Sequence, residues 1–514
     1  SSVGWPYFPT ESTKNQRLAR PLILSPHTMY TYSAAMFLTI LSLISPTLSA
    51  HAPEWRRRSI YQIVTDRFSR SDNSLTAPCE TQAREYCGGS WKGITNRLDY
   101  IANMGFSAIW ISPIVKQLEG STGYGEAYHG YWTRDLYSLN PQFGTQQDLM
   151  ELIDAAHARD IYVMLDVVLN HFASLGPDVN YAALRPFDNA RYFHSECDID
   201  WGNQTSIEAC WMGDSTVRLP DINTEDPDVQ TTLKQYLSDL VTSWKIDGIR
   251  LDASRNVAQP SWAAFCSAAN VYCQGEVWVR EPSIICPYQT VMDGLHNYPA
   301  KELATIAFAS SGSLNDFISV VQAMQTQCKD VTLFGSFMEN HDNPRLGSLT
   351  TDRGRLTNLA VINVLSDGIP IVYYGQEQAF TGSDDPNNRE ALWLSQFSTS
   401  GNLVPTFKAL NIFRNYVVAS GVPFISTLSV YKLINDNVMT ARKGSLTLVL
   451  TNSGSNIVIS SEADGFTPAE DLVDVLSCKH FQSDVTGKVD LILSGYPLVL
   501  YPRALLLTSG ICSL

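Results

Sequence analysis

Three short apolar segments of this chain each lead into a carboxylic acid. They are GIRLD, which ends at Asp252, QGEVW, which contains Glu276, and SFMENHD, which ends at Asp342. Each segment has the length and apolar content of a buried strand, so each acid is predicted to lie at the carboxyl end of a strand. Parallel barrels build their active sites at these strand ends. Three acids at one rim indicate chemistry on a glycosidic bond.

Cleavage of such a bond with retention needs a carboxylate nucleophile and a carboxylic acid about 5–5.5 Å apart. Asp252 and Glu276 are the candidates, because they end successive strand-like segments. Arg250 lies two residues before Asp252 on the same strand face, where its charge is expected to keep Asp252 ionised. Neighbouring carboxylates such as Asp342 are expected to keep Glu276 protonated. For any single acid the alternative is a solvated side chain or a helix cap.

Asn340, His341 and Asp342 end the third segment together. We expect them to hydrogen-bond sugar hydroxyls, and we expect Asp342 to stabilise the oxocarbenium-like transition state.

Strand-like and helix-like segments alternate along most of the chain, which predicts βα units and a (β/α)8 TIM barrel. The clear strand-like segments are SIYQIV, FSAIWIS, IYVMLDVVL, KIDGIRL, VYCQGEV, LFGSFM and GIPIVYY, and the stretch PYQTVMDGL is expected to hold the eighth strand. The barrel is assigned to residues 51–171 and 223–425, with an inserted subdomain at 172–222 after the third strand. Residues 426–514 are expected to form a C-terminal antiparallel β-sandwich.

The first 50 residues differ from the rest in composition. Residues 29–50 begin with Met29 and hold an apolar run that ends in small residues, which is typical of a signal peptide, and residues 1–28 are interpreted as a non-native upstream segment. A transmembrane anchor is the alternative, but the run at 34–44 is shorter than the roughly 20 residues of a span. We therefore expect a secreted, extracellular protein.

The net charge is −15 for the whole chain and −17 without residues 1–50. This charge disfavours nucleic acids and anionic membranes as partners and leaves a neutral substrate as the simplest one. A monomer is expected.

Ten cysteines in a secreted chain can form disulfides. Close spacing suggests four pairs, Cys79 with Cys87, Cys197 with Cys210, Cys286 with Cys328 and Cys478 with Cys512. Cys266 and Cys273 are then expected to be buried thiols. Asn203 begins an Asn-Gln-Thr glycosylation sequon.

Several motifs together resemble the α-amylases of the retaining α-glucoside hydrolase clan, and most closely secreted fungal α-amylases of the Taka-amylase type. They are DVVLNH (166–171), LPDIN (219–223), GIRLD (248–252), GEVW (275–278), FMENHD (337–342) and GIPIVYYGQE (368–377), and the resemblance covers nearly everything after residue 53. It implies that Asp252 is the nucleophile, Glu276 the acid/base and Asp342 the transition-state stabiliser. Arg250, His171 and His341 would support them.

The resemblance also implies residues that bind sugar. Tyr124 would stack on the glucose at the cleaved bond, His129, Tyr131 and Trp132 would lie near it, and Asp385 and Arg389 would hold a more distant glucose. Core packing is the alternative for Tyr128, Tyr131 and Trp132, and a loop salt bridge is the alternative for Asp385 and Arg389.

A calcium ion is implied in the same way, because hard cations take oxygen ligands. The matching positions are Asn170, Glu208, Asp221 and the backbone carbonyl of Asn256. Such a site would pin the inserted subdomain to the barrel, whereas the alternative for each acid is plain solvation.

One departure follows the nucleophile, where amylases usually carry Lys-His and this chain has Arg255-Asn256. Those positions normally contact sugars on the leaving-group side, so the balance between hydrolysis and transfer is open. The leading hypothesis is an endo-acting α-1,4-glucan hydrolase, an α-amylase, acting on starch, glycogen and maltooligosaccharides. A 4-α-glucanotransferase is the nearest alternative, followed by an α-glucosidase and by a non-catalytic sugar-binding or transporter-accessory protein.

Overall fold

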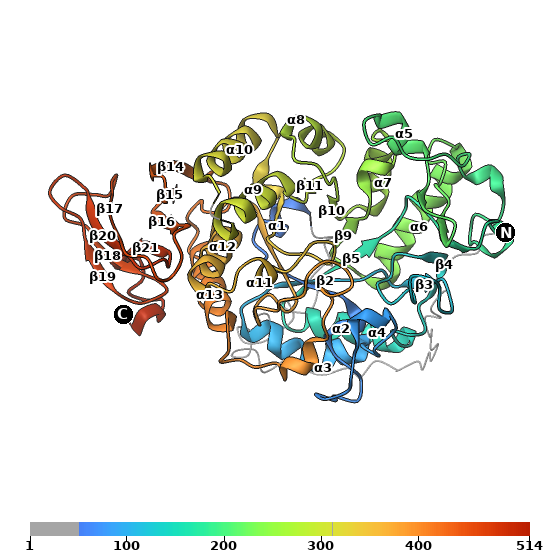
Figure 1. Cartoon of the computed structure of the whole chain (residues 1–514), viewed down its shortest axis with the longest axis horizontal. Helices are drawn as coiled ribbons and strands as arrows, with labels where there is room; N and C mark the ends of the chain where they lie inside the picture. Colours follow the sequence, from blue (N-terminus) through green and yellow to red (C-terminus); the bar gives the residue numbers. More distant parts are fainter. Residues whose placement is uncertain (1–50, 311, 514) are drawn as a thin grey trace, which may run out of the picture.

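The fold is that of a computed structural model, which describes residues 51–310 and 312–513 (Figure 1). The expected signal peptide and the upstream segment lie outside the described residues. At the centre is a sheet of eight strands in the order β11-β10-β9-β5-β2-β1-β13-β12. Its members are β1 Ile60–Ile63, β2 Ala108–Ile111, β5 Tyr162–Val167, β9 Gly248–Leu251, β10 Tyr272–Gly275, β11 Gly294–Leu295, β12 Gly335–Ser336 and β13 Ile369–Tyr373.

Every pairing within this sheet is parallel. A parallel bridge between His296, directly after β11, and Gly335 in β12 joins the two ends of the sheet, so the barrel is closed. The (β/α)8 barrel predicted from the sequence is confirmed. The eighth strand lies at the end of the stretch PYQTVMDGL, whose first four residues belong to a short 3₁₀ helix, Cys286–Thr290.

Helices follow the strands and form the outer layer of the barrel (Figure 1). The longer ones are α3 Trp91–Asn103, α4 Gln146–His157, α6 Pro227–Trp244, α7 Ser261–Ala269, α9 Tyr298–Ala309, α10 Leu314–Gln327, α12 Arg353–Leu365 and α13 Val404–Ala419. Short helices are α1 Ala52–Trp55, α2 Thr65–Phe68, α5 Gln204–Ala209, α8 Pro282–Ile285 and α11 Leu346–Leu349. No helix among residues 51–310 and 312–513 has the length and apolarity needed to cross a membrane.

The barrel interior is apolar at its amino end. Trp55 of α1 stacks on Tyr272 with ring centroids 5.3 Å apart, and Ile60, Met164 and Ile371 belong to the same buried cluster. A second, larger cluster fills the space between the strands and the helices. Because side chains alternate along a strand, β1, β2, β5, β10 and β13 supply residues to both clusters. The inward-facing charged side chains lie at the carboxyl ends of the strands.

Two further parts flank the barrel at opposite ends of the long axis (Figure 1). One contains the ribbon of β3 Val115–Gln117 with β4 Thr133–Leu139, and the sheet of β6 Ser174–Leu175, β8 Val217–Leu219 and β7 Met212–Gly213. The other is C-terminal and antiparallel. It has a sheet of β14 Val430–Asn435, β15 Val438–Lys443, β16 Leu446–Thr451, β21 Leu498–Pro502, β18 Asp471–Asp474 and β19 His480–Gln482, and a pair of β17 Ile459–Ala463 with β20 Val489–Leu493.

Four disulfides join Cys79 to Cys87, Cys197 to Cys210, Cys286 to Cys328 and Cys478 to Cys512. These are the pairs that the spacing suggests. Cys266 and Cys273 are free, and Cys273 is buried whereas Cys266 is partly exposed. Asn203 is exposed and caps α5, since its side chain accepts a hydrogen bond from the backbone N–H of Thr205 at 3.1 Å.

Candidate active site

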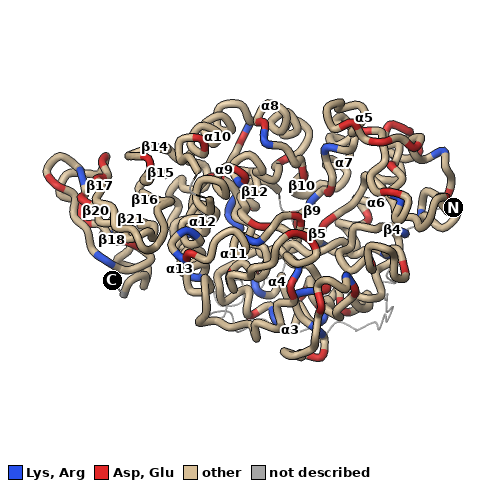
Figure 2. The backbone as a smooth tube through the Cα atoms, viewed as in Figure 1, with Lys and Arg blue, Asp and Glu red and all other residues tan. Residues whose placement is uncertain are grey.

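The inward positions at the carboxyl ends of three neighbouring strands are charged. In β9, Ile249 and Leu251 belong to the outer apolar cluster, so Arg250 points into the barrel. Asp252, two residues further on, continues the inward set. By the same alternation Asp166 points inward from β5, and Glu276 follows directly after β10. The strands therefore deliver three acids and one arginine to one end of the barrel, where Figure 2 shows acidic positions near β5, β9 and β10.

The guanidinium of Arg250 lies at the centre of this group. Its Nη1 atom is 2.7 Å from Oδ1 of Asp252 and 2.9 Å from Oδ1 of Asp166. Its Nη2 atom is 2.8 Å from Oε2 of Glu276. Because Asp252 and Glu276 bind the two terminal nitrogens of one planar guanidinium, their carboxylates lie close together at one end of the barrel. The proximity is what a nucleophile and an acid need, and the assignment of these two roles stays a prediction.

Burial works against the charge on these carboxylates. It raises the pKa of Asp252 well above its ordinary value, Arg250 opposes this rise, and the nearby Glu276 and Asp166 add to it. Burial also raises the pKa of Asp166. The expected ion pair with Arg250 is present, but desolvation is the larger effect. The charge of Arg250 thus favours the ionised form of Asp252, as the sequence predicts, while burial opposes it.

Asp342 faces the same group from the segment after β12. Burial and the nearby Glu276 raise the pKa of Asp342 to about 7, against the opposing charges of Arg389 and Arg250. Arg389 lies 3.6 Å from Oδ1 of Asp342 and 3.0 Å from Oδ1 of Asp385, so the structure brings these three side chains together.

His341 is buried, and its pKa lies well below the ordinary value because of desolvation and the nearby Arg389. Its Nδ1 atom lies 2.9 Å from Nε2 of Gln62, which is a donor. The proton of the neutral ring is therefore on Nε2, 3.2 Å from Oδ2 of Asp342. His341 can thus donate to Asp342 without carrying a charge.

An aromatic group packs on the other side of the carboxylates. The hydroxyl of Tyr131 donates to Oδ2 of Asp166 at 2.7 Å, and its ring is stacked on His341 with centroids 5.0 Å apart. His129 accepts from the backbone N–H of Tyr131 at 3.0 Å and touches the edge of Trp132. Tyr131 therefore belongs to the site. Tyr128 is 2% exposed, packs under Arg67, and accepts a hydrogen bond from Nη1 of Arg389 at 3.3 Å.

His171 contacts the backbone of this aromatic group. Its Nε2 atom lies 3.1 Å from the backbone carbonyl of Tyr131, and burial lowers its pKa to about 4, so the ring is neutral at ordinary pH.

Two of the expected substrate residues lie further out. Tyr124 is 44% exposed and donates its hydroxyl to Asp214, which lies between β7 and β8. Arg255 donates from Nε to Oε1 of Gln204 on α5 at 3.2 Å. The structure therefore does not bring Tyr124 or Arg255 into the hydrogen-bonded group around Arg250.

Comparisons with known proteins agree with this geometry. The family described as "Alpha amylase, catalytic domain" matches residues 62–409, and "Alpha-amylase, domain C" matches residues 432–514. The chain belongs to the α-amylase family. Alpha-amylase 2 of Schwanniomyces occidentalis is 42% identical over 479 residues, which are 90% of this chain and 94% of that protein. Alpha-amylase mde5 of Schizosaccharomyces pombe is 41% identical over 483 residues, 92% of this chain and 93% of that protein.

Solved structures lead to the same family. An α-amylase from Malbranchea cinnamomea has 42% identity and a TM-score of 0.88, and the match covers 90% of this chain and 100% of that chain. An α-amylase from Geobacillus thermoleovorans, solved with acarbose, has 29% identity and a TM-score of 0.74, with 87% of this chain and 99% of that chain covered. The resemblance inferred from the motifs is confirmed, and the protein is an enzyme of this family.

α-Amylases generally bind calcium, and the residues implied for this ion lie between the barrel and the inserted subdomain. Asn170 follows β5, Asp221 follows β8, Glu208 is on α5 and Asn256 follows β9. Oδ1 of Asn170 and Oδ1 of Asp221 are both buried acceptors without a hydrogen-bond partner. Burial raises the pKa of Asp221 to about 7. Orphaned buried oxygens need a partner, so Asn170 and Asp221 fit an oxygen-binding cation.

The sequence interpretation missed three side chains of the site. Asp166 binds Arg250, the indole of Trp110 donates to Asp166 at 3.1 Å, and the hydroxyl of Tyr298 donates to Oε1 of Glu276 at 2.9 Å. Asp166 could have been found, because it ends an apolar segment as the other acids do. Tyr298 could not, because it follows a strand of only two residues.

Proposed function

We propose that the protein is an endo-acting hydrolase of α-1,4-glucosidic bonds in starch, glycogen and maltooligosaccharides, with retention of configuration through a covalent glycosyl–Asp252 intermediate. The observation that carries the proposal is the shared guanidinium of Arg250, which holds Asp252 and Glu276 together at the carboxyl end of the barrel.

In the first step an oxygen of Asp252 bonds to the anomeric carbon while the bond to the glycosidic oxygen breaks. Glu276 gives its proton to that oxygen, and the departing chain leaves as an alcohol. In the second step Glu276 takes a proton from water, whose oxygen replaces Asp252 on the same carbon. Arg250 stabilises the carboxylates that form during both steps, since it contacts both side chains.

Asp342 and His341 are assigned to the sugar hydroxyls. Asp342 accepts hydrogen bonds from hydroxyls of the sugar whose glycosidic bond is cleaved, and these bonds strengthen as positive charge develops on that sugar. The donor Nε2 of His341 orients Asp342 for this role. Tyr124 is assigned to stacking on the sugar, because an exposed aromatic ring suits the C–H face of a glucose.

The test is the release of reducing sugar from soluble starch by the wild type and by Glu276→Gln, which is close in size but cannot donate a carboxylic proton. We expect a loss of more than a thousandfold, and a rapid fall of iodine staining by the wild type that marks endo cleavage. Equal release by both proteins would overturn the proposal.

Calcium is assigned to Asn170, Glu208, Asp221 and the backbone carbonyl of Asn256. The two unpartnered oxygens support this assignment, and a bound cation would favour the ionised form of Asp221. When bound, the ion would hold the inserted subdomain against the strand ends that carry Asp252.

Hydrolysis is proposed over transfer, because the relatives reported above are α-amylases. Arg255-Asn256 is the feature that could alter the acceptor side. Incubation with maltopentaose separates the two activities: we expect only shorter products, whereas products longer than the substrate would support a 4-α-glucanotransferase.

The remaining assignments concern the setting of the enzyme. We propose a secreted monomer without nucleic-acid or membrane partners, glycosylated at Asn203, with a barrel at 51–171 and 223–425, an inserted subdomain at 172–222 and a C-terminal domain at 426–514. Four disulfides and the exposure of Asn203 support secretion and glycosylation.

A further inference from the structure

The two carboxylate oxygens of Glu276 have different partners. Oε2 accepts from the backbone N–H of Ala253 at 3.1 Å and lies 2.8 Å from Nη2 of Arg250. Both partners are permanent donors, because an amide and a guanidinium keep their protons at any working pH. Oε2 thus already faces two donated hydrogens, which disfavours the carboxylic proton on the same oxygen. The transferable proton of Glu276 therefore belongs on Oε1.

Within residues 51–310 and 312–513, Oε1 has a single hydrogen-bond partner, the hydroxyl of Tyr298, which donates to it at 2.9 Å. The side chain of Asn340 donates from Nδ2 to the same hydroxyl oxygen at 3.1 Å. Because Asn340 occupies an acceptor position of the hydroxyl, the hydroxyl's own proton is directed at Glu276. Burial and the nearby charges of Glu276 and Asp342 raise the pKa of Tyr298 well above its ordinary value, so the donor stays protonated.

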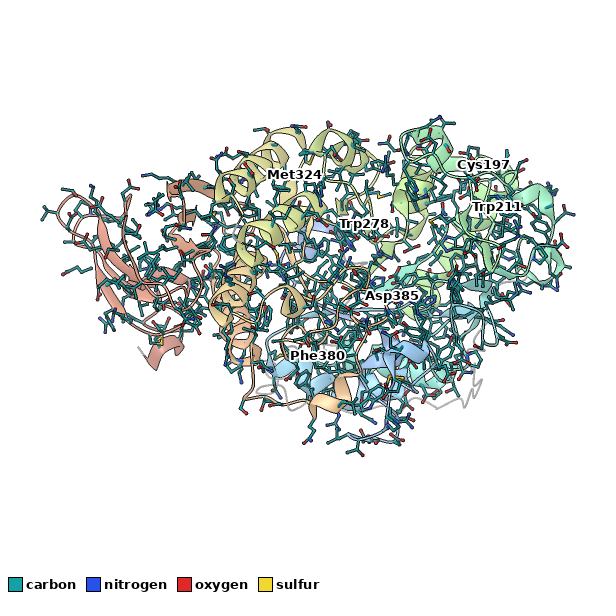
Figure 3. The ribbon with its side chains drawn as sticks, in the orientation of Figure 1. Cys197, Trp211, Trp278, Met324, Phe380 and Asp385 are labelled. Atoms are coloured by element: carbon teal, nitrogen blue, oxygen red, sulfur yellow. A yellow bond between two sulfur atoms is a disulfide. The ribbon has the colours of Figure 1, made fainter. Side chains whose placement is uncertain are left out.

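The ring of Tyr298 is held in place on two sides. It is fully buried, stacks on Trp278 with centroids 5.3 Å apart, and meets Phe337 edge to face at 5.0 Å. Trp278 itself is 49% exposed, and Figure 3 shows where it lies in the barrel part of the molecule. The packing leaves the hydroxyl little freedom to turn away from Glu276.

We propose that Tyr298 is a positioning residue for the acid/base: its hydroxyl holds Oε1 of Glu276, the oxygen that carries the transferable proton, and stabilises the carboxylate that remains once the proton has left. This inference rests on the proposed function. As the proton passes from Oε1 to the glycosidic oxygen, the bond between that oxygen and the anomeric carbon breaks and Asp252 bonds to the carbon. The proton of Tyr298 stays on Tyr298, and its hydrogen bond to Oε1 strengthens as charge develops there.

Several charged groups also face Glu276. Arg250 and Asp252 come from β9 and its end, Asp166 comes from β5, and Asp342 comes from the segment after β12. His296, after β11, faces the ring of Tyr298 and is neutral, because burial holds its pKa well below the ordinary value. All of these groups remain in Tyr298→Phe, which removes only the hydroxyl. A change in the pH profile of that variant therefore reports on the hydroxyl.

The test is the pH dependence of kcat/KM for a maltooligosaccharide. Without the donated bond Glu276 keeps its proton to higher pH, since a hydrogen bond to the charged form had favoured ionisation. The group that must be protonated sets the alkaline limb, so we expect this limb to move up by about one pH unit in Tyr298→Phe. We expect kcat to fall roughly tenfold or more, and to fall less with α-maltosyl fluoride, whose leaving group needs little protonation.

The matched control is Tyr272→Phe. Tyr272 is in strand β10, and its buried hydroxyl donates to the backbone carbonyl of Leu333 at 2.6 Å. The substitution removes this hydroxyl. Tyr272→Phe should lower the melting temperature without moving the alkaline limb. An unmoved limb in a folded Tyr298→Phe protein, or equal shifts in both variants, would overturn the inference.

A second probe covers the case in which Tyr298→Phe does not fold. Site-specific 3-fluorotyrosine in place of Tyr298 keeps the shape and makes the hydroxyl a stronger donor, so the alkaline limb should move to lower pH. A shift to higher pH or no shift would contradict the inference. Full activity of Glu276→Gln would instead overturn the proposed function itself, so the two failures are distinguishable.

Discussion

Replacement of Arg250 by methionine tests the electrostatics of the site. The side chain is 1% exposed and contacts Asp166, Asp252 and Glu276 at 2.9, 2.7 and 2.8 Å. Removal of one partner of a buried ion pair costs about 3–5 kcal/mol, because the other charge is left unpaired. Three carboxylates lose their partner here, but they can relieve the loss by taking up protons. We therefore expect Arg250→Met to lower the free energy of unfolding by about 3–5 kcal/mol near neutral pH.

The effect should depend on pH with a definite sign. The pKa values of Asp166 and Asp252 are raised in the folded protein, so between the unfolded value of 3.8 and the folded values the folded state binds more protons. Stability contributed by such groups falls as pH rises through this window. Loss of Arg250 raises both folded pKa values further and extends the window upward. Arg250→Met should thus be much less destabilised at pH 5 than at pH 8.

The assay is thermal unfolding followed by circular dichroism at both pH values, with the double variant Arg250→Met/Asp166→Asn. Asp166→Asn removes one of the carboxylates left without a partner in Arg250→Met. The double variant should therefore be more stable, by about 1–3 kcal/mol, than the summed effects of the two single substitutions predict. Additive effects, or equal destabilisation by Arg250→Met at pH 5 and pH 8, would refute the reasoning.

Three further predictions follow from other parts of the molecule. Removal of calcium with EGTA should lower the melting temperature of the wild type by several degrees, because two buried oxygens lose their partner. The melting temperature of Asp221→Asn should fall by less. An unchanged melting temperature of the wild type would contradict the calcium assignment. Thiol titration of the denatured, unreduced protein should give two thiols, Cys266 and Cys273, and a count of zero or four would show a different pairing. Tyr124→Ala should raise KM for maltooligosaccharides about tenfold with little change in stability, since the ring is 44% exposed, and an unchanged KM would remove Tyr124 from the binding site.

Much of the fold could be predicted because its signals are local. Runs such as IYVMLDVVL and GIPIVYY are apolar enough to mark buried strands, and strand alternation then places Arg250 and Asp252 on one face. The β11 strand has only two residues, so its side-chain periodicity carries almost no information. The 3₁₀ helix Cys286–Thr290 shortly before it further masks the strand pattern in the sequence.

The candidate site was predictable in its residue types but less so in its electrostatics. The ion pair between Arg250 and Asp252 follows from spacing along one strand, whereas the extent of burial follows from the closure of the whole barrel. Burial decides the direction in which the pKa of Asp252 moves. Tyr298 begins helix α9, 22 residues after Glu276, and Trp110 lies in β2, 56 residues before Asp166, so no spacing rule brings these pairs together.

Covalent trapping tests the central claim most directly. An activated 5-fluoro-α-glycosyl fluoride forms the glycosyl-enzyme quickly and releases it slowly, so the labelled residue can be identified by mass spectrometry of the digested protein. We predict one label per chain, in the peptide that contains Asp252, and no label in Asp252→Asn. A label on Glu276 or Asp342, or turnover that inverts the anomeric configuration, would contradict the assignment of Asp252 as the nucleophile.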